Sequence, residues 1–133
     1  MKFEDLNLHP TLLKAVKDQN YTTPTAIQQK AIPYILKRND VLGTAQTGTG
    51  KTAAFALPIL HHIENEKDNS GKRKVKALVA TPTRELAIQI AENFTSYSKY
   101  SSVKNTVIYG GVKQGSQTTA LANGVDVLIA TPG

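Results

Sequence analysis

The chain has 133 residues, enough for one domain with a buried core, and its 40% hydrophobic and 20% charged residues are ordinary for a globular protein. Sixteen basic against ten acidic side chains give a formal charge of +6, which suits a polyanion such as nucleic acid without proving one. The lack of cysteine excludes disulfides and thiolate metal sites, and with no leader-like start and no apolar run of membrane-spanning length we expect a cytoplasmic protein.

Two short helices are expected in the first 36 residues. The first is predicted over about 10–19, with Pro10 in its first turn. A loop follows, and Thr25 with Gln28 three residues on forms a capping-box pattern that opens the second helix. Pro33 is expected to kink or restart that helix. The apolar face of the first helix consists of Leu8, Leu12, Leu13 and Val16.

From residue 41 onward, short apolar strands alternate with helices, which predicts an α/β fold with a parallel sheet and flanking helices. The expected strands cover 41–43, 77–80, 106–109 and 125–129. The expected helices run from 52 to 62, through a face of Leu86, Ile90, Phe94 and Tyr97, and from the Gly110-Gly111 pair to near Gly124. The mixed-charge segment 64–76 has no apolar periodicity and is expected to be an exposed loop, with a dedicated RNA contact as the weaker alternative.

A phosphate-binding loop is indicated between the first strand and its helix. Gly48-Thr49-Gly50-Lys51-Thr52 stands where glycines let backbone N–H groups surround phosphate oxygens at a helix N-terminus. Lys51 would neutralise the β and γ phosphates of a nucleotide, and the Thr52 hydroxyl could bind Mg²⁺. An ordinary Gly-rich turn would explain the glycines but leave the lysine unexplained.

The full loop is Ala45-Gln46-Thr47-Gly48-Thr49-Gly50-Lys51-Thr52, with Ala45 where the general pattern has glycine. This variant resembles the phosphate loop of the DEAD-box RNA helicases. The resemblance covers essentially the whole chain and implies a RecA-like phosphate-loop NTPase domain that uses ATP and Mg²⁺.

The same resemblance extends to the family's adenine-recognition motif, through Phe3, Tyr21, Thr23 and Gln28. It implies that Tyr21 stacks on adenine and that Gln28 hydrogen-bonds its edge, as an amide suits a base with an N6 donor beside an N7 acceptor. On spacing alone, Gln28 reads as a capping-box residue and Tyr21 as a packed aromatic. The resemblance instead favours the adenine-binding roles for both residues.

Downstream, three groups of residues match family motifs that contact the RNA sugar-phosphate backbone. They are Pro82, Thr83 and Arg84; the pair Gly110 and Gly111; and Thr131 with Gly133. Hydroxyls, a guanidinium and accessible backbone N–H groups suit phosphate contacts, which carry no base information and weaken with salt. Each group also has an ordinary reading, as a turn, a loop or solvated helix charges. All follow expected strands at their carboxyl ends, where parallel α/β sheets bind ligands.

The chain lacks the Asp-Glu-Ala-Asp motif that gives the family its name, and neither Asp40 nor Asp126 matches its position. We therefore expect an incomplete domain, with an adenine-recognition segment over 1–36 and a partial RecA-like domain over 37–133. The second RecA-like domain is missing as a partner, and self-association of the open sheet is possible. The expected function is the ATP-binding portion of an ATP-dependent RNA helicase that by itself hydrolyses ATP inefficiently. The alternatives are a non-catalytic ATP- or AMP-binding module and a phosphate-loop ATPase acting on DNA or protein.

Overall fold

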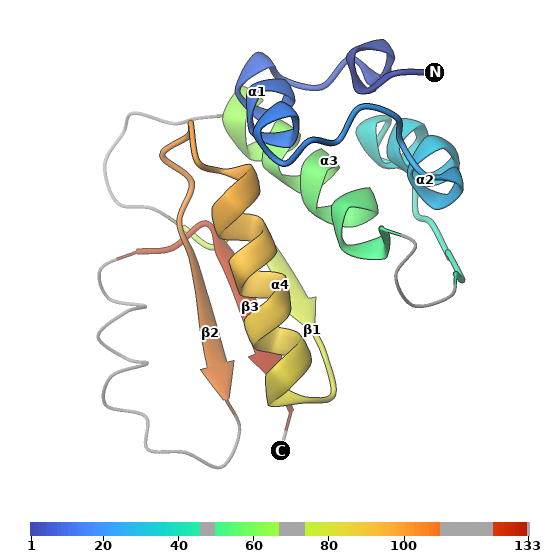
Figure 1. The fold of residues 1–133 in the computed structure, drawn as a ribbon. Coiled ribbons are helices and arrows are strands. Elements are labelled where there is room, and N and C mark those ends of the chain that lie inside the picture. Colours follow the sequence, from blue (N-terminus) through green and yellow to red (C-terminus); the bar gives the residue numbers. More distant parts are fainter. Residues whose placement is uncertain (46–49, 67–73, 110–123, 133) are drawn as a thin grey trace.

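A computed structural model of the chain describes residues 1–45, 50–66, 74–109 and 124–132. Its sheet is parallel throughout and has the order β1-β3-β2 (Figure 1). The strands are β1 (Ala77–Ala80), β2 (Asn105–Tyr109) and β3 (Val127–Thr131). Ala77 and Asn105 both pair with Val127, while Tyr109 pairs with Thr131, so the carboxyl ends of the strands lie at one edge. The expected α/β class and parallel sheet are confirmed.

The helices are a 3-10 turn η1 (Phe3–Leu6), α1 (Pro10–Asp18), α2 (Ala26–Leu36), α3 (Lys51–Asn65) and α4 (Arg84–Tyr97). α4 packs on β2 and β3, while α3 packs between α2 and α4 (Figure 1). Apolar side chains from these layers form one core, which includes Leu12, Ile32, Leu57, Phe94 and Ile129. Because α1 and α2 are held against α3, the N-terminal segment lies beside the start of the phosphate-loop helix.

The helix signals were mostly confirmed. Thr25 accepts from the backbone N–H of Gln28, whose side chain accepts from the backbone N–H of Thr25, so the capping box of α2 is formed. Pro33 does not restart the helix, which runs on to Leu36. On α4 the buried face includes Ala87 rather than Leu86, whose side chain is 39% exposed. The other three residues of the predicted face are buried.

The expected strand over 41–43 is wrong. Residues 41–45 have no regular structure, and Leu42 is 96% exposed. A strand needs a neighbouring strand to pair its backbone groups, and within the described ranges none lies beside this segment. The last strand also begins two residues later than expected, at Val127. Asp126 lies just before the strand, where its carboxylate accepts from the Lys104 backbone N–H.

The expected loop over 64–76 is partly wrong, since α3 continues to Asn65 and Glu64 is buried. Lys74–Lys76 are exposed and irregular, as expected, and 67–73 lie outside the described residues. The helix predicted between Gly110 and Gly124 also lies outside them, apart from Gly124 itself. In the part of the chain that the structure describes, no helix is long and apolar enough to cross a membrane.

Candidate functional site

A cleft of about 1060 Å³ opens between the N-terminal segment, the start of α3, and the β1–α4 unit. Residues from four parts of the chain line it. They include Phe3, Tyr21, Thr23 and Gln28; Gly50, Lys51, Thr52 and Phe55; Leu78, Thr81 and Pro82; and Leu86, Ile90 and Tyr97. Of the predicted phosphate-binding residues, Gly50, Lys51 and Thr52 therefore share one cavity with the predicted adenine-binding residues, although the two motifs lie far apart in sequence.

The first turn of α3 forms the polar end of the cleft. Its N-cap, Gly50, has φ 81° and carries no side chain that could cap the first N–H groups of the helix. Lys51 is exposed at the first helical position and Thr52 is half-buried at the second. A positive helix terminus, an ammonium and a hydroxyl together fit a nucleotide phosphate. Gln46, Thr47, Gly48 and Thr49 lie outside the described residues, and Ala45 is half-buried but does not line the cleft.

Gln28 joins α2 to the start of α3. Its side-chain Nε2 donates to the Gly50 carbonyl at 3.1 Å, and its Oε1 accepts from the Thr25 N–H at 2.9 Å. The residue is only 3% exposed. A Cβ at Gly50 would lie 2.3 Å from Gln28 Nε2, so the close approach as well as the positive φ requires glycine. Gln28 thus forms the capping box that its spacing predicted, and its two contacts fix the orientation of its amide.

Tyr21 lies in an aromatic wall at the apolar end of the cleft. Its ring stacks on Phe3 with centroids 6.2 Å apart and meets Tyr97 at 6.3 Å in a tilted arrangement. Phe3 is buried, whereas Tyr21 is 39% exposed. Burial raises the pKa of the Tyr97 hydroxyl, and hydrogen bonding to Tyr21 raises it further. Tyr21 is therefore both a packed aromatic and an accessible one.

The predicted RNA-contacting residues lie at the carboxyl edge of the sheet. Thr83 caps α4 by accepting from the Leu86 N–H at 3.2 Å, and the Arg84 guanidinium lies over the Tyr109 ring, 5.4 Å from its centroid. Thr131 ends β3 and is buried. Pro82 also lines the cleft, so this edge shares the cleft with the start of α3. Gly110, Gly111 and Gly133 lie outside the described residues.

Thr81 and Tyr109 are two residues that the sequence reasoning missed. Tyr109 pairs with Thr131 at the ends of their strands and stacks under Arg84, which its position as the last residue of a strand could have suggested. The Thr81 side chain is buried in the cleft wall, and its hydroxyl has no hydrogen-bond partner in the described part of the chain. Such a hydroxyl carries an uncompensated desolvation cost.

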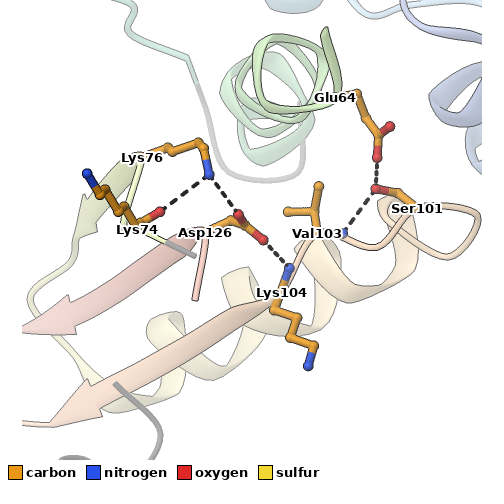
Figure 2. Close-up of polar contacts among 7 residues, drawn as sticks. All are labelled: Glu64, Lys74, Lys76, Ser101, Val103, Lys104 and Asp126. Atoms are coloured by element: carbon orange, nitrogen blue, oxygen red, sulfur yellow. Dashed lines mark hydrogen bonds and ion pairs between the residues drawn. The ribbon is translucent and has the colours of Figure 1, made fainter. Parts of the chain in front are cut away.

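Asp126 belongs to the opposite, amino edge of the sheet. Its carboxylate accepts from the Lys104 backbone N–H at 2.9 Å and from Lys76 Nζ at 3.1 Å (Figure 2). Its backbone bonds both segments as well, accepting from Lys76 and donating to the Lys104 carbonyl. Asp126 therefore ties the starts of the three strands together and is remote from the cleft's polar end. No cluster of three or more metal-ligating side chains occurs among the residues with described positions.

Comparison with protein families decides the identity. The DEAD/DEAH box helicase family matches residues 25–133. The chain belongs to that family.

Similar proteins include the DEAD-box ATP-dependent RNA helicase RhpA of Helicobacter pylori, 44% identical over 98% of this chain and 25% of its own length. ATP-dependent RNA helicase DeaD of Mycobacterium tuberculosis is 47% identical over 98% of this chain and 23% of its length. A crystal structure of a hypothetical ATP-dependent RNA helicase from Sulfolobus tokodaii has TM-score 0.81 and 34% identity, covering 95% of this chain and 34% of that one.

This DEAD-box chain spans about a quarter of the length of the curated relatives it matches, in their N-terminal portion. It corresponds to part of a RecA-like helicase domain, as the sequence predicted. It is thus part of the helicase domain that defines the DEAD-box family.

Proposed function

We propose that the chain binds an adenine nucleotide in the cleft between α3 and β1. The observation that supports this most is the convergence of Lys51 and Thr52 with Tyr21 and Gln28 on one cavity. The uncapped start of α3 and the Lys51 ammonium suit the phosphates, and the exposed face of Tyr21 suits the base. The second N–H and the second oxygen lone pair of the Gln28 amide would favour adenine over guanine.

The donors present also fit Mg²⁺ that arrives with the nucleotide. Magnesium in phosphate-loop proteins keeps several waters and takes one or two protein oxygens plus phosphate oxygens, so the half-buried Thr52 hydroxyl is a sufficient protein ligand. When bound, the ion would neutralise phosphate charge. The chain's own part is to hold and orient the phosphates through Lys51 and the α3 terminus.

In the parent protein we assign this portion to RNA-stimulated ATP hydrolysis coupled to local RNA unwinding. The isolated 133 residues should not hydrolyse ATP efficiently. The acidic pair that would orient the attacking water is absent from the sequence, and Asp126 is engaged in the sheet. Phosphate release from this chain at the rate of a full-length relative would refute this part of the proposal.

Nucleotide binding can be tested by titrating the chain with ATP and GTP in isothermal calorimetry. Lys51→Ala should abolish binding, whereas Lys104→Ala should leave it unchanged, since that exposed side chain lies away from the cleft. Gln28→Ala should narrow the preference for ATP over GTP. Thr25→Ala is its control, because it weakens the same helix cap but keeps the amide. Equal binding of both nucleotides by the wild type would favour a general phosphate-loop ATPase.

RNA contact is proposed at the carboxyl edge, through Thr83, Arg84 and Thr131. Anisotropy titrations with single-stranded RNAs of different sequence should give similar affinities that fall with salt. Arg84→Ala should lower the slope of log affinity against log salt by about 0.7, the value for one lost phosphate contact on a single strand. Lys17→Ala, which alters an exposed cation on α1, should not. Nucleotide binding without any RNA affinity would favour the non-catalytic binding module.

A further inference from the structure

The three histidines of the chain gather at one place, although His9 is 52 residues from His61 in sequence. His61 and His62 lie side by side on α3 with their rings 5.7 Å apart at 77°. They point to different neighbours: His61 accepts from the His9 backbone N–H at the start of α1, and His62 contacts the Ile35 carbonyl at the end of α2. Two consecutive residues of the phosphate-loop helix thus hold both helices of the adenine-recognition segment.

The contact of His61 works in one protonation state only. Its Nδ1 lies 2.9 Å from the His9 backbone nitrogen, which is a fixed donor, so Nδ1 must be unprotonated and the neutral ring carries its proton on Nε2. A second proton on Nδ1 would set two donors against each other. The Asn65 amide nitrogen lies 2.9 Å from Nε2. Because a protonated Nε2 needs an acceptor, this tautomer requires a half-turn of the Asn65 amide that brings its oxygen to Nε2. Burial, followed by the charges of His62 and His9, lowers the pKa of His61, in agreement with a neutral ring.

The other two histidines respond differently. His62 presents Nε2 to the Ile35 carbonyl at 3.0 Å, an acceptor that a neutral ring protonated at Nε2 and a cationic ring satisfy equally. His9 caps α1, with Nδ1 3.2 Å from the Thr11 N–H. Protonation of His9 would therefore weaken a helix cap, whereas protonation of His61 would part α1 from α3.

The titratable groups that face His61 are His9 from α1 and His62 from α3 itself. Charged groups on the surrounding elements are engaged elsewhere: Arg38 with Glu66, Glu64 with Ser101, and Asp18 with Lys99 and Tyr100. Among the described residues, the charges that act on His61 are those of His62 and His9, and no carboxylate adds to them.

We propose that His61 is a positioning residue of the nucleotide cleft that acts only as the neutral imidazole, and that acidification releases α1 from α3 and loosens the cleft. His61 lies ten residues after Lys51 on the same helix, about 15 Å along its axis. α1 and α2 flank the Tyr21 loop, and α2 carries Gln28. The hydrogen bond from the His9 N–H to His61 Nδ1, which we call the latch, therefore holds α1 near the C-terminal end of α3, while the cleft lies at the N-terminal end of α3. The effect on nucleotide binding depends on the proposed function, whereas the latch itself does not.

The latch can be tested without nucleotide. Nitrogen-15 NMR of the histidine rings of the 133-residue chain should show His61 with Nδ1 unprotonated near pH 8 and with a pKa below that of a free histidine. Because the folded-state pKa is lowered, the unfolded chain binds more protons as pH falls below about 6.5, so stability should fall there. A protonated Nδ1 near pH 8 would overturn the proposal.

Isosteric amides assign the pH dependence to one residue. His61→Asn places an oxygen near the Nδ1 position that accepts from His9 but does not titrate, so its urea-unfolding profile between about pH 5 and pH 8 should be flatter than that of the wild type. His9→Asn keeps an N-cap acceptor, and His62→Gln keeps a donor near Ile35. Neither should remove the larger part of the dependence. An unchanged profile in His61→Asn would contradict the latch.

Nucleotide affinity gives the second readout. Acidification should weaken ATP binding to the wild type by about fivefold more than to His61→Asn, and comparing both at the same pH cancels protonation of ATP itself. Equal weakening would overturn the coupling to the cleft. If neither protein binds ATP at any pH, the proposed function fails, and the latch is judged from the ring tautomer and the unfolding profiles.

Discussion

At the scale of single residues, Gly50 carries two constraints at once. Its φ of 81° costs a side-chain-bearing residue about 1–2 kcal/mol, and a Cβ would displace the Gln28 amide from the Gly50 carbonyl. Gly50→Ala should therefore lower the free energy of unfolding by about 2–3 kcal/mol in urea titrations. In a Gln28→Ala background the clash with the amide disappears and only the 3.2 Å approach to Thr25 Oγ1 remains, so the same change should cost little beyond the backbone part. Equal costs in both backgrounds would show that the close approach to Gln28 is unimportant.

Removing the Thr81 hydroxyl, in contrast, is expected to stabilise the protein. It is buried and unpaired within the described residues, so exchanging it for a methyl group removes a desolvation cost without changing shape. Thr81→Val should raise the free energy of unfolding by about 1 kcal/mol, which would appear as a higher urea midpoint. Ser98→Ala is the comparison, because the buried Ser98 hydroxyl donates to the Phe94 carbonyl at 2.7 Å, so its removal should lower stability. Destabilisation by Thr81→Val would show that the hydroxyl is satisfied in solution.

At the scale of elements, the three strands depend on a contact that precedes them. Removing the Asp126 carboxylate would leave the part-buried Lys104 N–H without that acceptor and detach Lys76 (Figure 2). Asp126→Ala should cost about 3 kcal/mol, within the range for breaking a buried charged pair. Lys76→Met removes only the ammonium, which is partly exposed, and should cost about 1 kcal/mol or less in the same urea titrations. Similar losses in the two variants would assign the stability to the ion pair instead of the backbone contact.

Elements and motifs with local signals were predictable from the sequence. The capping box of α2, the amphipathic α1 and the apolar strands each depend on residues within one or two turns of each other. The failures involve long-range partners: residues 41–45 lack a pairing strand among those described, and Asp126 is an anchor only because Lys76 and Lys104 approach it. The histidine cluster could not be foreseen for the same reason. The candidate cleft was predictable through its motifs, but the Gln28 contact with Gly50 was not.

At the scale of the whole molecule, the described sheet has two edge strands, β1 and β2, and β1 carries a strongly exposed apolar side chain. β1 pairs with β3 on one side only within the described ranges, and Leu78 on this strand is 66% exposed beside the cleft. An unpaired apolar edge is a template for another strand. We therefore predict reversible self-association of the chain that rises with concentration in sedimentation velocity. Added salt should strengthen it, because the net charge of +6 repels like copies at low ionic strength.

A lysine on this edge should suppress the association, since a charged side chain blocks strand addition. Leu78→Lys is therefore expected to shift the chain toward monomer. Leu42→Lys is the matched control: Leu42 is 96% exposed, yet its segment belongs to no strand, so the same added charge should have a smaller effect. If both variants suppress association equally, general charge and apolar exposure drive it. If only Leu78→Lys does, the open edge of β1 is the surface where copies of this chain meet.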